Sequence, residues 1–149
     1  MDRGREARPG IDAARGATLA RLILDTTVLI DAERDTEALE KRIGDRDDVG
    51  IAAVTAAELL VGVELADEHR RERRERYVGD VLKTISVESY DLHVARAHAR
   101  LLAHVRRSGT PRGVHDLIIA ATAVACDREI VSADADAFEG LPGIVLRAL

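Results

Sequence analysis

The feature that most constrains the fold is the alternation, over most of the chain, of short apolar runs with longer helical segments. Short runs rich in Val, Ile and Leu that are bounded by polar residues predict buried strands. We expect strands at 21–25, 49–54, 84–87, 130–132 and 143–146. Strands that alternate with helices form a parallel sheet covered on both faces. The sequence therefore predicts an α/β fold, an α/β/α sandwich with a mainly parallel central sheet.

Helices are expected between these runs, because apolar residues recur there at three- and four-residue spacing. Asp35 and Thr36 are candidate caps for a short helix. The segment from Thr55 to Glu58 has the Ser/Thr-x-x-Glu spacing of a capping box, which predicts a helix that begins near Thr55. The expected helices cover about 26–35, 36–42, 55–66, 67–82, 89–107 and 115–129.

A chain of 149 residues has the usual size of one domain. We expect a weakly ordered N-terminal extension over 1–20 and one folded domain over 21–149. The extension lacks the apolar centre of a secretory signal, and no stretch of the chain reaches the roughly 18 apolar residues of a membrane span. Cys126 is the only cysteine and lies in an apolar run. We therefore predict a buried, unreactive thiol and a reducing compartment, the cytoplasm.

The composition limits how this protein could bind nucleic acid. Aromatic residues make up 2% of the chain and Trp is missing, whereas stacking platforms need several aromatic side chains on one face. The formal charge of −5 also argues against a polyanionic partner. A cluster of acids that binds divalent cations is the exception. Any RNA contact is therefore expected to be electrostatic or mediated by metal.

Four acidic residues lie at the ends of expected elements. Asp25 ends the first expected strand, and Glu58 lies in the first turn of the helix after the second. Asp116 begins the Ala-rich helix, and Asp134 follows the strand at 130–132. Ligands of open parallel sheets bind outside the carboxyl ends of the strands. We therefore predict that these four carboxylates meet in one site.

Such a cluster has a definite chemical consequence. Two carboxylates 4 Å apart repel by about 4 kcal/mol at an effective dielectric constant near 20, so several cannot stay ionised together without a cation. Oxygen ligands favour Mg²⁺ or Mn²⁺, and the lack of nearby Cys or paired His argues against zinc. These ions can activate water and stabilise the leaving oxygen of a phosphodiester. The cluster thus predicts metal-dependent hydrolysis of RNA.

Each acid also has a purely structural interpretation. Asp25 could cap the helix that follows it, and Glu58 could complete the capping box. Asp116 could stabilise the positive end of its helix, while Asp134 and Asp136 could be ordinary turn residues. The joint placement of the acids, rather than any one of them, favours the metal site.

Basic and hydroxyl residues are further candidates. The segment 69–76 alternates Arg and Glu at i, i+4 spacing, which favours a self-paired, solvated helix face over an RNA-binding surface. Arg112, in the loop before the Ala-rich helix, is the better candidate for a phosphate contact. Thr55 is expected to hold Glu58 in place through the start of its helix.

The blocks LILDTTVLIDAERD, TAAELLVG and HDLIIAATAVACDREIVSADADAF with LPGIVL resemble the PIN-domain ribonucleases, and most of all the VapC-type toxins of bacterial toxin–antitoxin pairs. The resemblance covers about 21–149. It implies a PIN-like fold and an endoribonuclease that uses Mg²⁺ or Mn²⁺ and leaves a 5′-phosphate and a 3′-hydroxyl. It also implies a homodimer or a larger toxin–antitoxin assembly, and a small antitoxin that blocks the cleft, commonly with a basic side chain.

The resemblance also implies roles for individual residues. The acidic tetrad would be Asp25, Glu58, Asp116 and Asp134. We expect Asp25 and Asp116 to bind the metal directly, and the other two acids to complete the site directly or through water. The residues expected to support these acids or to contact substrate are Thr26, Thr27, Thr55, Arg112 and Asp136.

The sequence departs from the family pattern at two places. Thr27 stands where Asn or Ser is usual, which keeps a hydroxyl and adds a methyl group. The last block contains both Asp134 and Asp136, so the identity of the fourth acid stays open.

Two rival functions remain. Phosphoryl transfer on a small substrate needs a second acid beside the first-strand Asp or two residues after it, but Thr26 and Thr27 occupy those positions. In a non-catalytic, protein-binding domain, the acids would only cap helices.

Overall fold

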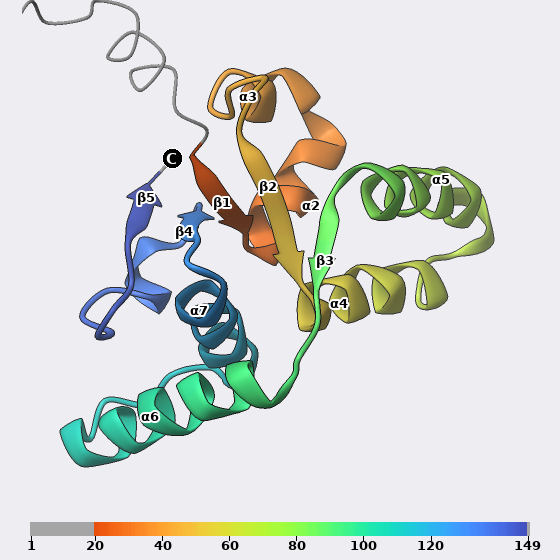
Figure 1. Ribbon diagram of the computed structural model, residues 1–149. Coiled ribbons are helices and arrows are strands. Elements are labelled where there is room, and N and C mark those ends of the chain that lie inside the picture. Colours follow the sequence, from red (N-terminus) through yellow and green to blue (C-terminus); the bar gives the residue numbers. More distant parts are fainter. Residues whose placement is uncertain (1–19, 149) are drawn as a thin grey trace, which may run out of the picture.

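The computed structural model describes residues 20–148. Its centre is a sheet of five strands in the order β3-β2-β1-β4-β5, and every neighbouring pair is parallel (Figure 1). The strands are β1 (Arg21–Leu24), β2 (Asp48–Ala52), β3 (Ser86–Glu88), β4 (Glu129–Ser132) and β5 (Leu146–Ala148). The predicted parallel sheet is confirmed. The extension expected over 1–20 lies outside the described residues except for its last position.

Helices cover both faces of this sheet, as predicted. In Figure 1, α6 and α7 pack together on one side, while α2, α4 and α5 lie on the other. The helices are α2 (Thr26–Arg34), α3 (Thr36–Glu40), α4 (Ala53–Glu64), α5 (Glu68–Thr84), α6 (Leu92–Ser108) and α7 (Val114–Cys126), and a 3-10 turn, η1 (Ala135–Ala137), follows β4.

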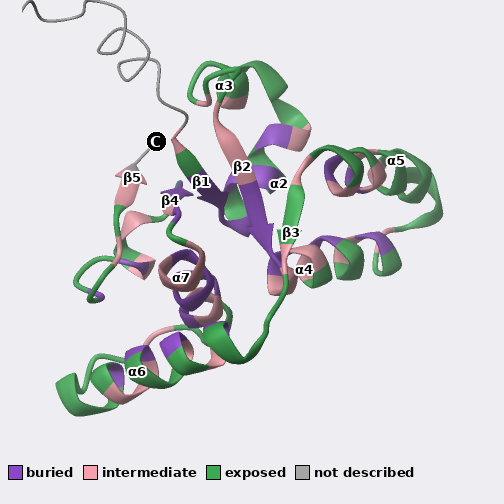
Figure 2. Cartoon of the chain, viewed as in Figure 1, coloured by how far each residue is buried: buried purple, intermediate pink, exposed green. Residues whose placement is uncertain are grey.

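The two faces of β1 belong to two separate hydrophobic cores. Ile23 packs with α6 and α7, whereas Leu22 and Leu24 pack with residues of α2, α4 and α5. All three side chains are fully buried, and Figure 2 shows the central strands as the most buried part of the chain. Side chains of a strand alternate between its faces, so an uninterrupted apolar run is the pattern that a strand between two helical layers requires.

A buried arginine ties several strands together. Arg128 is 8% exposed and donates hydrogen bonds to the carbonyl oxygens of Leu22 in β1 (3.1 Å) and Asp48 in β2 (2.9 Å). It also forms an ion pair with Glu88 of β3 at 2.7 Å. A Cβ at Gly50 would lie 3.1 Å from the guanidinium carbon, so glycine leaves room for the arginine.

Three predicted details are wrong. Helix α4 begins at Ala53, two residues before Thr55, and its N-cap makes no side-chain hydrogen bond, so the capping box does not form. Strand β5 begins at Leu146 instead of 143, because Gly143 adopts a turn conformation with φ of 78°. Cys126 is half-buried instead of buried. No described helix is both long and apolar enough to span a membrane.

Candidate active site

Asp25 is the most firmly held of the predicted acids. It directly follows the central strand β1, it caps α2, and it is 3% exposed. Its Oδ1 accepts hydrogen bonds from the Thr27 hydroxyl (2.6 Å) and the Val28 amide (3.2 Å). The capping interpretation is therefore confirmed, and it does not exclude a functional role. A carboxylate that receives several hydrogen bonds is held in one orientation.

Ser132, which sequence analysis missed, completes the surroundings of Asp25. It ends β4, which is paired with β1 so that Leu24 lies beside Val131. The buried Ser132 hydroxyl donates to Asp25 Oδ2 at 2.5 Å and accepts from the Asp134 amide at 2.9 Å. One hydroxyl thus joins the first and last acids of the predicted tetrad. The signal available in the sequence was a polar residue at the end of an otherwise apolar strand.

Glu58 lies on the outer side of this arrangement, on α4. Its Oε1 accepts a hydrogen bond from the Thr26 hydroxyl (3.1 Å) and lies 3.3 Å from His115 Nδ1. The expected support from Thr55 does not form: the Thr55 side chain is fully buried and its hydroxyl has no hydrogen-bond partner. Thr26 of α2 and His115 of α7 position Glu58 instead.

Asp116 lies in the first turn of α7, and its pKa is shifted by burial and by the charges of neighbouring residues. Burial raises its pKa above the usual 3.8 of an aspartate, and the negative charges of Asp25, Asp134 and Glu58 raise it further, while His115 lowers it. The four predicted acids, from separate parts of the chain, therefore lie in one electrostatic neighbourhood.

A glycine makes room for the Asp116 side chain. A Cβ placed on Gly113, the N-cap of α7, would lie 2.7 Å from Asp116 Oδ2. This distance is too short for real atoms, so a side chain at 113 would displace the carboxylate.

The two candidates for the fourth acid are both exposed but differ in their surroundings. The charge of Asp134 contributes to the raised pKa of Asp116, whereas Asp136 is not among the causes of that shift. The backbone carbonyl of Asp136 accepts a hydrogen bond from Arg112 (2.5 Å), and a second bond from Arg112 goes to the carbonyl of Glu139 (2.5 Å). Arg112 thus anchors the turn after β4, and its expected contact with a phosphate stays a prediction.

The donor set fits a hard divalent cation in its chemistry. All four acids offer carboxylate oxygens, which Mg²⁺ and Mn²⁺ prefer. Within residues 20–148, no three His, Cys, Asp or Glu side chains converge closely enough to hold an ion as they stand. Carboxylates that lie near one another repel, and a divalent cation would balance their charge.

Comparisons with known proteins agree with this arrangement. Residues 22–143 match the family model described as PIN domain. "Ribonuclease VapC5" of Mycobacterium tuberculosis is 37% identical over 131 residues, which cover 85% of this chain and 91% of that protein. "Ribonuclease VapC" of Rickettsia bellii is 27% identical over 122 residues, or 81% of this chain and 90% of that protein.

Solved structures show the same fold. The VapBC-5 toxin–antitoxin structure from Mycobacterium tuberculosis superposes with a TM-score of 0.72 at 34% identity and covers 87% of this chain and 99% of that one. DNA-bound VapBC from Salmonella typhimurium gives a TM-score of 0.78 at 27% identity and covers 87% and 98%.

Proposed function

The chain belongs to the PIN-domain family and, within it, to the VapC ribonucleases, and we propose that it is an endoribonuclease that depends on Mg²⁺ or Mn²⁺ and acts as the toxin of a toxin–antitoxin pair. Its substrate is RNA, and its products carry a 5′-phosphate and a 3′-hydroxyl. The observation that carries the proposal is the buried Asp25 carboxylate at the end of β1, which Ser132 joins to the backbone of Asp134. The charges of Asp25, Asp134 and Glu58 also help to raise the pKa of Asp116, after burial, which is the largest cause.

Asp25 and Asp116 are the proposed direct ligands of the metal, and Glu58 and Asp134 complete the site. The bound ion supplies Lewis-acid chemistry at the phosphate and stabilises the charge that develops on the leaving oxygen. The protein's own contribution is to orient its ligands. Ser132 and Thr27 fix the two oxygens of Asp25.

Two neighbouring side chains position Glu58. Thr26 and His115 fix Oε1 of Glu58. The hydroxyls of Thr26 and Thr27 both serve carboxylates of the site, which supports a metal-binding role over the phosphoryl-transfer alternative.

The partners follow from the same assignment. The similar structure from Mycobacterium tuberculosis is a member of the VapBC family of toxin–antitoxin systems. We propose that a small antitoxin covers this acidic cluster with a basic side chain, that the toxin forms a homodimer, and that both proteins act in the cytoplasm. The complementary charge of such a side chain would balance the carboxylates in place of the metal ion.

RNA cleavage in the presence and absence of Mn²⁺ tests the catalytic proposal. We expect cleavage by the wild type with Mn²⁺ and none with EDTA, and a loss of at least about a hundredfold in Asp25→Asn and Asp116→Asn. Asp127→Asn is the matched control: it makes the same change at an exposed position whose φ of 52° suits asparagine. Equal cleavage by all four proteins would show that the acidic cluster is not the active site, and no cleavage by any of them would favour a non-catalytic domain.

The toxin assignment has a separate test in cells. Expression of the wild type should arrest growth, and co-expression of the gene immediately upstream, if it encodes a small DNA-binding protein, should relieve the arrest. Arrest that persists in Asp25→Asn would show that growth inhibition does not require RNA hydrolysis.

A further inference from the structure

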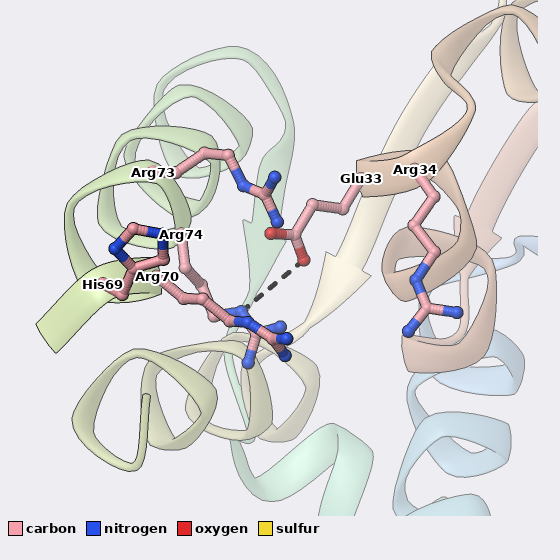
Figure 3. Close-up of a pocket in the computed structure, with 6 residues that line it drawn as sticks. All are labelled: Glu33, Arg34, His69, Arg70, Arg73 and Arg74. Carbon is pink, nitrogen blue, oxygen red and sulfur yellow. Dashed lines mark ion pairs between the residues drawn. The ribbon is translucent and has the colours of Figure 1, made fainter. Parts of the chain in front are cut away.

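A cleft lined by charged side chains lies between the C-terminal end of α2 and the N-terminal part of α5. Its volume is about 390 Å³. Figure 3 shows Glu33 reaching from α2 toward side chains of α5 that face it. No lining residue is apolar: the cleft is formed by Glu33, Arg34, His69, Arg70, Arg73 and Arg74. Four arginines and one carboxylate therefore line the same cleft.

The single acid balances only part of this positive charge. Glu33 pairs with Arg74 at 3.6 Å, and Arg74 also donates to the carbonyl of Gly62. Among the ion pairs within residues 20–148, none involves Arg34, Arg70 or Arg73. Three guanidinium groups thus face one cleft without a carboxylate partner, in a protein whose formal charge is −5.

The self-paired helix face predicted for 69–76 forms only in part. Arg76 pairs with Glu72 at 2.8 Å, as the spacing predicted. Arg71 instead donates to the backbone carbonyl of Glu64. Arg70 and Arg73 are three residues apart on one face of α5, so they project together into the cleft rather than toward the glutamates of their own helix.

Two arginines outside this cleft are engaged in structural contacts. Arg112 is bound to two backbone carbonyls, and Arg128 is buried among the strands. An acidic nuclease still needs positive charge to hold the strand that it cuts, because phosphate neutralisation supplies most of the affinity for nucleic acid. Among residues 20–148, the cleft between α2 and α5 contains three arginines that form no ion pair: Arg34, Arg70 and Arg73.

We propose that this cleft binds backbone phosphates of the RNA strand, a few nucleotides from the bond that is cut. The inference rests on the proposed function, since it concerns the same substrate. A lining of charged groups without apolar side chains suits a phosphate backbone better than a peptide, because peptide sites have apolar centres. Guanidinium groups match phosphate geometry with paired hydrogen bonds.

The length of α2 allows one RNA strand to reach both the acidic cluster and the arginine-lined cleft. Asp25 caps the start of this nine-residue helix, and Arg34 is its last residue. At 1.5 Å per residue, the two ends are about 14 Å apart. A stacked strand that rises roughly 3.4 Å per nucleotide covers this distance in about four nucleotides.

The test measures RNA binding without cleavage. A fluorescent single-stranded RNA of twelve nucleotides is titrated with Asp25→Asn protein in EDTA over a range of salt concentrations. Adding Arg70→Gln and Arg73→Gln should weaken binding at low salt roughly tenfold and reduce the slope of log Kd against log salt by about 1.4, since each single-strand phosphate contact contributes about 0.7. Circular dichroism checks that both proteins are folded.

The matched control places the same charge change elsewhere. Arg106→Gln with Arg107→Gln alters two exposed arginines of α6, on the opposite face of the sheet (Figure 1). This pair should leave the slope within about 0.3 of the parent value. An equal loss in both double variants would show that only net charge matters, which would overturn the proposal.

Two further outcomes separate this inference from the proposed function. If the wild type cuts RNA with Mn²⁺ but the Arg70/Arg73 change leaves the salt slope unaltered, the phosphate cleft is wrong and the nuclease assignment stands. If the slope falls but the wild type never cuts RNA, the cleft stands and the nuclease assignment fails. An unaltered RNA slope with lost binding of a ten-residue poly-glutamate probe would assign the cleft to an acidic protein partner and overturn the proposal.

Discussion

Ser132 contacts both Asp25 and the backbone of Asp134, and its removal is a direct test of how the acids are positioned. Ser132→Ala should lower the RNA cleavage rate and the affinity for Mn²⁺ by about 10- to 100-fold, as is typical of residues that orient a metal ligand. Ser132→Thr, which keeps the hydroxyl, should recover part of this loss. Full activity in Ser132→Ala would show that the other two donors to Asp25 are sufficient.

A substitution at Gly113 is a second test of how the acids are positioned, because one added methyl group would meet the Asp116 carboxylate. Gly113→Ala would place a methyl group against the Asp116 carboxylate, and we expect the cleavage rate to fall about tenfold or more while Tm changes little. The matched control is Gly79→Ala on α5, where a Cβ meets nothing within 4 Å. That variant should be fully active and about 0.5–1 kcal/mol more stable, because alanine favours helices. Unchanged catalysis in Gly113→Ala would contradict a direct role for Asp116.

The raised pKa of Asp116 predicts how stability depends on pH. The folded protein binds this proton more tightly than the unfolded chain, so Asp116 lowers the unfolding free energy as pH rises from 3.8 through the folded pKa. In EDTA, Asp116→Asn should therefore have a higher Tm than the wild type at pH 7, and the difference should disappear below pH 3.8. The effect is small because Asp116 is partly exposed. An equal Tm of the two proteins at pH 7 would show that neither burial nor the neighbouring carboxylates destabilise the ionised Asp116 measurably.

Among the elements, the parallel strands depend on Arg128 as well as on their own hydrogen bonds. Arg128→Met removes contacts to β1, β2 and β3 and leaves Glu88 without its partner. We expect a loss of about 2–4 kcal/mol in the free energy of unfolding, measured by urea denaturation. Arg147→Met is the control, because Arg147 forms a more exposed ion pair with Glu129 and should cost about 1 kcal/mol or less. Equal losses in the free energy of unfolding would show that the buried Arg128 contacts stabilise the fold no more than the exposed ion pair of Arg147.

At the scale of the whole molecule, metal binding should appear as thermal stabilisation. A ligand that binds only the folded state adds about 2.7 kcal/mol when its concentration is a hundred times its Kd. We therefore expect Mn²⁺ to raise the Tm of the wild type and EDTA to reverse the increase. Asp25→Asn and Asp116→Asn should show little response, whereas Asp127→Asn should behave as the wild type. A similar increase in all four proteins would locate the ion outside the acidic cluster.

The sequence by itself determined the strands, the order of the helices and the four acids. Those features depend on local patterns: apolar runs such as Leu22 to Leu24 form strands between two layers, and acids at strand ends face the carboxyl edge of a parallel sheet. Asp25 could be identified because it directly follows such a run.

Only the tertiary structure decided which side chains meet. Ser132 reaches Asp25 because β4 pairs beside β1, and Arg112 is occupied by carbonyls of a turn 24 or more residues away. The start of α4 and the unpaired arginines of α5 also depend on neighbours that are distant in the chain. Sequence spacing reports contacts within one element, whereas these contacts arise when separate elements pack together.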